Sequence, residues 1–196
     1  MPDPAVPLLR EKAQLMSASE IERTLVRLAH EIVEKNDGVD NLALIGIRRR
    51  GEPLARRLAA LAGRIESKPV PVGTLDITYY RDDLSSPNDQ RDRSRQAPKP
   101  LVKPAQIDFD INGLNVILVD DVLYTGRTIR AALDALFDHG RPRRVQLCAL
   151  IDRGHRELPI EASFVGKYVH TAAHETVQLR LHEIDAAEKV LLMEPA

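Results

Sequence analysis

The sequence predicts an α/β fold in which a mostly parallel central sheet is flanked by helices. Short apolar runs alternate with stretches of helical periodicity, a pattern typical of βαβ units. The run at 116–119, Val-Ile-Leu-Val, is unbroken and mainly β-branched, as expected of a strand that is buried on both faces. The chain has 196 residues, 43% hydrophobic and 29% charged, which suffices for one domain with a substantial core.

The first helix is predicted from a capping box and a periodic apolar face. Ser19 fits the N-cap position, and Glu22 fits the residue that reaches back to the cap. The helix should end near residue 35, and its buried face should consist of Ile21, Leu25, Leu28 and Ile32. A second helix, rich in Ala and Leu, should follow residue 51. A third should begin after Thr128, where apolar residues again recur at helical spacing.

The strands are predicted from apolar and β-branched runs that lie between turn residues. They are expected at 42–47, 70–78, 114–119, 144–151, 164–169, 177–184 and 189–193. Strands that alternate with helices favour a parallel sheet, and the carboxyl ends of its strands should carry the ligand site.

Two segments are expected to lie outside this framework. Residues 1–16 lack the basic start and the long apolar stretch of a signal peptide, so we interpret them as a flexible leader before a single domain at 17–196. The segment 85–104 is rich in proline, arginine and lysine and has almost no apolar residues. It predicts a flexible loop over about residues 81–106.

Composition narrows the class of protein. No apolar run approaches the ~20 residues of a membrane span, so no membrane partner is expected. The single cysteine, Cys148, lies in an apolar strand and is expected to be a buried thiol, which favours a cytoplasmic location. Because the net charge is only −1, any nucleic-acid surface must be local.

The run VILVDDVLYTGRT at 116–128 is the most informative part of the chain. Asp120 and Asp121 follow the apolar strand, and a Thr/Gly loop then leads into a helix. Gly126 allows close backbone approach, and the amides at a helix N-terminus favour an anion such as a phosphate monoester. Two carboxylates can accept hydrogen bonds from sugar hydroxyls or approach Mg²⁺. A ribose 5-phosphate fits this set. The alternative is an ordinary strand–helix turn with a solvated acidic cap.

Two further loops should reach the same edge of the sheet. Three successive arginines, Arg48 to Arg50, stand at a helix N-terminus, where positive charge is unfavourable unless a polyanion offsets it. The loop predicts a pyrophosphate site, and a basic solvated turn is the alternative. The segment 152–159 contains Gly154 and Pro159, which predict a tight loop against which a base could lie. His155 in this loop could be a general acid or base, or a surface donor.

Four motifs in order carry a resemblance to a known family. They read GIRRRG at 46–51, DITYYRDD at 76–83, VILVDDVLYTGRT at 116–128 and DRGHRELPI at 152–160. The third is similar at every position to the phosphoribosyl pyrophosphate (PRPP) motif of the type I phosphoribosyltransferases. Together they resemble a branch of that family, the bifunctional pyrimidine operon regulators and uracil phosphoribosyltransferases. The resemblance covers about residues 17–193 and departs in the leader and in the length of the 85–104 loop.

The resemblance implies the type I phosphoribosyltransferase fold, with a small hood near the C-terminal strands. It implies transfer of phosphoribosyl from PRPP to uracil, giving UMP and pyrophosphate, with Mg²⁺ as cofactor. The implied catalytic residues are Asp120, Asp121, Arg49 and Arg50, and the two aspartates are also the implied metal ligands. The implied substrate-binding residues are Arg48, Arg49, Arg50, Gly51, Arg81, Asp82, Asp120, Asp121, Val122, Leu123, Tyr124, Thr125, Gly126, Arg127, Thr128, Asp152, Arg153 and Gly154.

The resemblance also implies regulation. Members bind a hairpin in pyrimidine (pyr) operon mRNA when UMP or UTP is present, and they act as homodimers or higher oligomers. The implied RNA-binding residues are Arg23, Arg27, His30, Lys35, His155, Arg156, Lys167 and Thr171. For the residues on the first helix, a solvated face is the alternative. A non-catalytic sensor of UMP that binds RNA is the rival function. A purine phosphoribosyltransferase is a weaker alternative.

Overall fold

The central sheet of the computed structural model, which describes residues 8–78, 80 and 105–196, has six strands in the order β4-β3-β2-β5-β6-β7. The strands are β2 (Leu42–Ile47), β3 (Val72–Leu75), β4 (Ala105–Gln106), β5 (Asn115–Leu123), β6 (Arg144–Asp152) and β7 (Phe164–Tyr168). All neighbours are parallel except β3 and β4. The predicted mostly parallel α/β fold is therefore confirmed.

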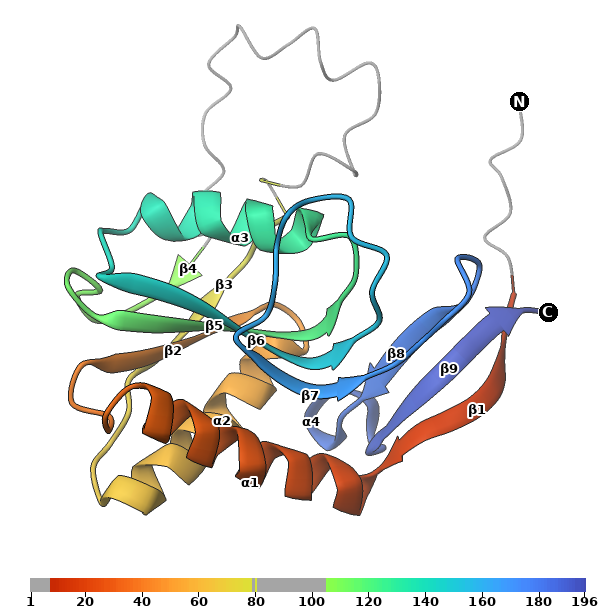
Figure 1. The fold of residues 1–196 in the computed structure, drawn as a ribbon, viewed down its shortest axis with the longest axis horizontal. Helices are drawn as coiled ribbons and strands as arrows, with labels where there is room; N and C mark the ends of the chain where they lie inside the picture. The colour runs from red at the N-terminus through yellow and green to blue at the C-terminus, as the bar shows by residue number, and fades with distance from the viewer. Residues whose placement is uncertain (1–7, 79, 81–104) are drawn as a thin grey trace, which may run out of the picture.

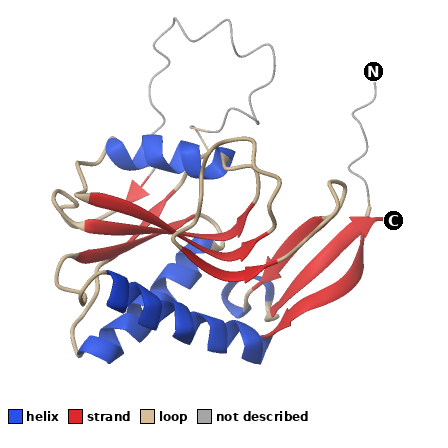
Figure 2. Ribbon diagram, viewed as in Figure 1, coloured by secondary structure: helices blue, strands red, loops and turns tan. Residues whose placement is uncertain are grey.

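Helices cover both faces of this sheet (Figures 1 and 2). α1 (Ala18–Lys35) and α2 (Gly51–Glu66) lie on one face, and α3 (Arg127–Phe137) lies on the other. Each face has its own apolar cluster, one built around α1 and α2 and the other around α3. Residues that alternate along β5 belong to opposite clusters, because successive side chains of a strand point to opposite faces.

A second, antiparallel sheet forms the hood, in the order β1-β9-β8. Its strands are β1 (Leu9–Ser17), β8 (Thr176–Arg180) and β9 (Lys189–Pro195), and the short α4 (His182–Asp185) lies between the last two. Figure 1 shows the hood beside the C-terminal ends of the central strands. The hood that the family resemblance implied is present.

The interpretation of residues 1–16 as a flexible leader is wrong for residues 9–16, because β1 pairs with β9 along its length. Its register shifts between Glu11 and Ala13 and again between Gln14 and Met16. Each shift breaks the period-two alternation that identifies a strand, so the sequence pattern of β1 was masked. Residues 1–7 lie outside the described part of the chain.

Other boundaries also differ from the prediction. β5 continues through the acidic pair to Leu123, because β6 pairs with it over that length. Ala105 and Gln106, placed in the flexible loop, form β4. The expected strand at 177–184 ends at Arg180 before α4, and the expected strand at 70–78 is limited to Val72–Leu75. Within the described ranges, none of the helices is long and apolar enough to cross a bilayer.

The first helix is capped two residues earlier than predicted. The carboxylate of Glu20 accepts hydrogen bonds from the backbone N–H (2.8 Å) and the hydroxyl (2.7 Å) of Ser17, the N-cap residue. The sequence Ser-Ala-Ser-Glu offers two serines, and the end of β1 at residue 17 selects the first. These hydrogen bonds lower the pKa of the Glu20 carboxyl, because they stabilise its charged form.

Replacing Ser17 with alanine should destabilise the protein by about 1 kcal/mol, the usual effect of losing an N-cap. Ser19→Ala, the matched control in the first turn of the same helix, should have less than half that effect. Urea unfolding followed by circular dichroism measures both. Equal effects of the two substitutions would contradict the assignment of Ser17 as the cap.

Candidate active site

The predicted site residues of β2, β5 and β6 meet at one edge of the central sheet. Gly46 pairs with Val119, directly before the acidic pair, and Asp120 pairs with Ala149 of β6. Leu123 pairs with Asp152. Because these strands are parallel, their carboxyl ends bring together the arginine loop, the acidic pair and the 152–154 loop, as the sequence predicted.

The acidic pair is held by the backbone of its own strand. Asp120 is 6% exposed, and its Oδ1 accepts the N–H of Asp121 at 2.9 Å. Asp121 Oδ1 accepts the N–H of Val122 at the same distance. Burial raises the pKa of the Asp121 carboxyl above its ordinary value, and contacts with Asp120, Val122 and Arg50 offset only part of that effect. The pair is thus an anchored set of hydrogen-bond acceptors.

A cavity of about 310 Å³ lies beyond the acidic pair. It is lined by Asp120, Val122, Leu123, Tyr124, Thr125, Gly126, Arg127, Thr128, Ile129 and Glu157. Gly126 is the N-cap of α3 and has a positive φ of 93°, a conformation that favours glycine. The cavity therefore opens at the N-terminus of α3, where backbone amides and the helix dipole favour an anion.

The loop after β6 is hydrogen-bonded to the loop after β5. The carbonyl of Thr125 accepts the N–H groups of Glu157 (3.0 Å) and Leu158 (3.2 Å). The carbonyl of Tyr124 accepts Arg156 Nη1 at 2.8 Å, and the carbonyl of Leu123 accepts the N–H of Arg153 at 3.1 Å. The anion cavity and the 152–160 segment are consequently one rigid unit.

The arginine loop packs directly against β5. A Cβ atom added at Gly51 would lie 2.2 Å from the carbonyl oxygen of Val119 and 3.4 Å from the Cα of Asp120. Gly51 therefore supplies a close backbone approach rather than a positive-φ turn. Arg50 donates from Nη2 to Asp185 of the hood at 2.8 Å, and Arg49 is exposed. Arg50 is also close enough to Asp121 for its charge to lower the pKa of that carboxyl.

The 152–154 loop borders a separate cavity of about 430 Å³. The Asp152 carboxylate accepts the N–H of Gly154 at 2.9 Å and also pairs with Arg156. The guanidinium of Arg153 lies 4.1 Å from the centroid of the Tyr124 ring, so it connects this cavity with the anion cavity. The second cavity therefore lies next to the anion cavity, with the Arg153–Tyr124 contact between them.

The predicted RNA-binding residues come from α1, where His30 is exposed, from β7 and from two loops. Arg23, Arg27 and Lys167 line a groove of about 310 Å³ between α1 and β7. Lys35 lies at the other end of α1, whereas His155, Arg156 and Thr171 belong to loops beside the active-site edge. Arg27, Lys35 and Lys167 each donate to backbone carbonyls, of Gly166, Ser163 and Leu15 respectively. These three side chains therefore also stabilise the fold.

Some relevant residues were not predicted. Glu157 lines the anion cavity and pairs with Arg127 at 2.7 Å, and Asp185 holds Arg50. Glu157 lies within the 152–160 motif, whereas nothing in the local sequence around Asp185 indicates the site, because its contact with Arg50 spans 135 residues. Arg81 and Asp82 lie outside the described residues, so their role in substrate binding stays a prediction.

The carboxylates of Asp120 and Asp121 suit a magnesium ion whose other ligands are substrate and water oxygens. Within the described ranges, no group of three or more histidine, cysteine or acidic side chains could hold a metal. Asp120 and Asp121 nevertheless present hard oxygen donors next to the anion cavity. Mg²⁺ commonly binds through one or two carboxylates plus substrate phosphates, so these residues fit it.

Comparison with known proteins identifies the class of protein that carries this site. The phosphoribosyl transferase domain family matches residues 12–183 of the chain. Solved structures share the fold. A hypoxanthine-guanine phosphoribosyltransferase of Bacillus anthracis has a TM-score of 0.64 at 18% identity and covers 95% of this chain and 99% of its own. The hypoxanthine phosphoribosyltransferase of Trypanosoma cruzi has a TM-score of 0.66 at 19% identity, covering 95% and 98%. The chain belongs to the phosphoribosyltransferase family.

Closer relatives define the branch. The bifunctional protein PyrR of Pelotomaculum thermopropionicum is 54% identical over 96% of this chain and 99% of its own length. The bifunctional protein PyrR of Roseiflexus is 59% identical over 88% and 89%, and that of Thermus aquaticus is 54% identical over 95% and 98%. Within the phosphoribosyltransferases, the chain belongs to the PyrR family.

The tight packing of Gly51 predicts that a larger residue at this position lowers the free energy of unfolding. Gly51→Ala should destabilise the protein by about 2 kcal/mol, because the added methyl group meets the backbone of Val119, which cannot move without disturbing β5. Ala60→Ser, a control on the exposed side of the same helix, should change stability by less than about 0.5 kcal/mol. Urea unfolding midpoints measure both. A Gly51→Ala protein as stable as the wild type would show that the arginine loop is not packed against β5 in solution.

Proposed function

We propose that the protein transfers the phosphoribosyl group of PRPP to uracil, giving UMP and pyrophosphate, and that it regulates pyr operon expression through uridine-nucleotide-dependent binding to mRNA. The observation that carries the enzymatic part is the meeting of an arginine loop, a buried acidic pair and an anion cavity at one sheet edge. A ribose with phosphate groups at both ends matches this arrangement, in which the acidic pair lies between the arginine loop and the anion cavity. The buried free thiol of Cys148 suits a reducing cytoplasm, where we place the reaction.

In the proposed mechanism the side chains bind, orient and stabilise charge. The amides and hydroxyls of Thr125 to Thr128 hold the 5-phosphate, and Asp120 and Asp121 accept hydrogen bonds from the ribose hydroxyls. The bond from C1 to pyrophosphate breaks, the bond from C1 to N1 of uracil forms, and the N1 proton is released. Arg49 and Arg50 stabilise the charge that develops on pyrophosphate. Asp120 and Asp121 would hold a Mg²⁺ ion, which would supply further neutralisation of the phosphate charge.

Uracil is assigned to the second cavity, next to Asp152, Arg153 and Gly154. The positive φ values of Gly154 (74°) and His155 (59°) turn the backbone sharply at this point. The turn brings the backbone of Gly154 to the border of this cavity, where we place the edge of the base. This assignment is supported by the contact of Arg153, which lines the second cavity, with Tyr124, which lines the anion cavity.

The regulatory part of the proposal rests on the PyrR relatives and on the groove between α1 and β7. Arg23, Arg27 and Lys167 give this groove local positive charge in a chain whose net charge is −1. RNA phosphates are the matching ligand. We propose UMP or UTP as the effector and a homodimer or larger homo-oligomer as the RNA-binding form, because repeated copies of one groove extend the basic surface.

A non-catalytic sensor that binds UMP and RNA is the second candidate. The acidic pair and the anion cavity would serve a sensor as well. The arginine loop favours the enzyme, since a sensor of UMP has no pyrophosphate to stabilise.

A pyrophosphate-release assay tests the enzymatic proposal. With PRPP and Mg²⁺, turnover is expected with uracil and not with hypoxanthine, guanine or orotate. Asp120→Asn combined with Asp121→Asn should lower turnover by at least about 10³-fold, because the ribose loses both charged acceptors, while the protein remains folded. The control is Asp134→Asn, an exposed aspartate on α3. Retained activity in the double variant would refute the ribose assignment. A folded wild type that binds UMP without turnover would favour the sensor.

Binding of a pyr leader hairpin tests the regulatory proposal. Arg23→Ala should weaken UMP-dependent RNA binding and lower the slope of log K against log salt by about one, the signature of one lost phosphate contact. Its stability should not change, because Arg23 is exposed. Arg27→Ala should weaken RNA binding and also destabilise the fold, because Arg27 donates to the carbonyl of Gly166 at 2.6 Å. If Arg23→Ala binds RNA with wild-type affinity, the groove is not the RNA-binding surface.

A further inference from the structure

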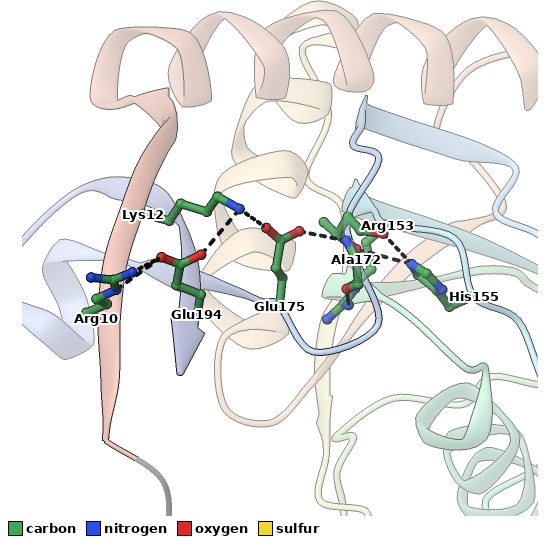
Figure 3. A network of polar contacts seen from close by, with 8 residues as sticks. Arg10, Lys12, Arg153, His155, Ala172, Glu175 and Glu194 are labelled. Carbon is green, nitrogen blue, oxygen red and sulfur yellow. Dashed lines mark hydrogen bonds and ion pairs between the residues drawn. The ribbon is translucent and has the colours of Figure 1, made fainter. Parts of the chain in front are cut away.

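A chain of polar contacts runs from the hood to the proposed base site (Figure 3). Arg10 and Lys12 of β1 both pair with Glu194 of β9, at 2.7 and 3.3 Å. Lys12 also pairs with Glu175, which lies just before β8. Glu175 accepts the backbone N–H of Ala172 at 2.6 Å. The Glu175 carboxylate thus links Lys12 of the hood to the loop between β7 and β8, and the N–H of Glu175 also donates to the carbonyl of Ala172 at 3.2 Å.

Glu175 is a buried charge with two different partners. The residue is 6% exposed, and Lys12 and the Ala172 amide stabilise its charged carboxylate. The same contacts lower the pKa of this carboxyl below its ordinary value. Such a group restricts the position of the segment that it bonds, here residues 171–175.

That segment supplies the acceptors that hold Arg153. Arg153 Nε donates to Thr171 Oγ1 at 3.1 Å, and Nη2 donates to the carbonyl of Ala172 at 3.2 Å. Both acceptors are neutral oxygens. His155 Nε2 lies 2.7 Å from the carbonyl of Thr171, which ties the two loops together once more. Arg153 is only 5% exposed, and its guanidinium faces the Tyr124 ring. Its orientation therefore depends on where residues 171 and 172 lie.

We infer that Glu175, fixed by Lys12, is a positioning residue that holds Arg153 in place for uracil. This inference rests on the proposed function, because it assigns the base to the cavity beside Arg153. Arg153 has a long side chain with many rotamers. Because this side chain is already ordered in the free protein, uracil binding does not have to supply the free energy of ordering it. Neither Glu175 nor Lys12 lines the cavity.

The first test is a steady-state comparison of Glu175→Gln and Lys12→Met with the wild type. Each variant should raise the KM for uracil by about fivefold, the cost of ordering one long side chain on binding. The kcat and the KM for PRPP should stay within about twofold, since the acidic pair and the anion cavity are unaltered. Lys12→Arg, which keeps the charge, should restore the wild-type KM. Arg10→Met is the matched control, because Arg10 contacts Glu194 but not Glu175.

The second test reads Arg153 directly and does not need turnover. In the wild type, the Nε–H of Arg153 should give a narrow ¹H–¹⁵N resonance that is absent from Arg153→Lys, the variant that assigns it. In Glu175→Gln and Lys12→Met, hydrogen exchange at this group should accelerate by about tenfold or more, because its acceptor loop is released. Arg10→Met should leave the resonance unchanged.

The outcomes separate this inference from the proposed function. If the wild type does not use uracil, the proposed function fails, and the Arg153 resonance still tests the positioning role. If the wild type uses uracil but folded Glu175→Gln keeps the wild-type KM and resonance, the positioning role is refuted. A variant that is only less stable, with both readouts unchanged, also refutes it. If Glu175→Gln fails to fold, Lys12→Met decides by the same two readouts.

Discussion

The parallel register of β2, β5 and β6 is the constraint on which the rest of the structure depends. It places the ends of three strands, and the loops that follow them, at one edge of the sheet. The contact of Gly51 with Val119 then sets the separation between the arginine loop and the acidic pair at the minimum that backbones allow. Opposite charges are brought together by packing, so the site exists before any ligand arrives.

The hood acts on this edge through ion pairs that cross between the two sheets. Asp185 holds Arg50, whereas Glu183 and Glu188 hold Arg57 of α2. These contacts also moderate the mutual repulsion of basic residues near the N-terminus of α2. The hood therefore contacts the arginine loop through α4, and it contacts the loop before β8 through the Lys12–Glu175 pair.

The local parts of the site could be predicted because their signals lie within a few residues of one another. The strand, the acidic pair and the Thr/Gly loop follow in direct succession, so residue types and spacing suffice to indicate an anion site beside two carboxylates. The arginine loop is similar. The extent of β5 could not be predicted in this way, since pairing with β6 keeps Asp120 and Asp121 inside the strand although aspartate disfavours that conformation.

By itself, the sequence determined the α/β class, the order of most elements and the motif loops, because hydrophobic periodicity and turn chemistry are short-range. Only the tertiary structure decided the hood, since β1 pairs with a strand from the other end of the chain and its bulges conceal its period. The tertiary structure also decided that residues 9–16 form a strand and that Ser17 caps the first helix. It likewise decided the ion pairs of Lys12 with Glu175 and of Arg50 with Asp185. Those contacts join residues far apart in sequence, and no local pattern contains them.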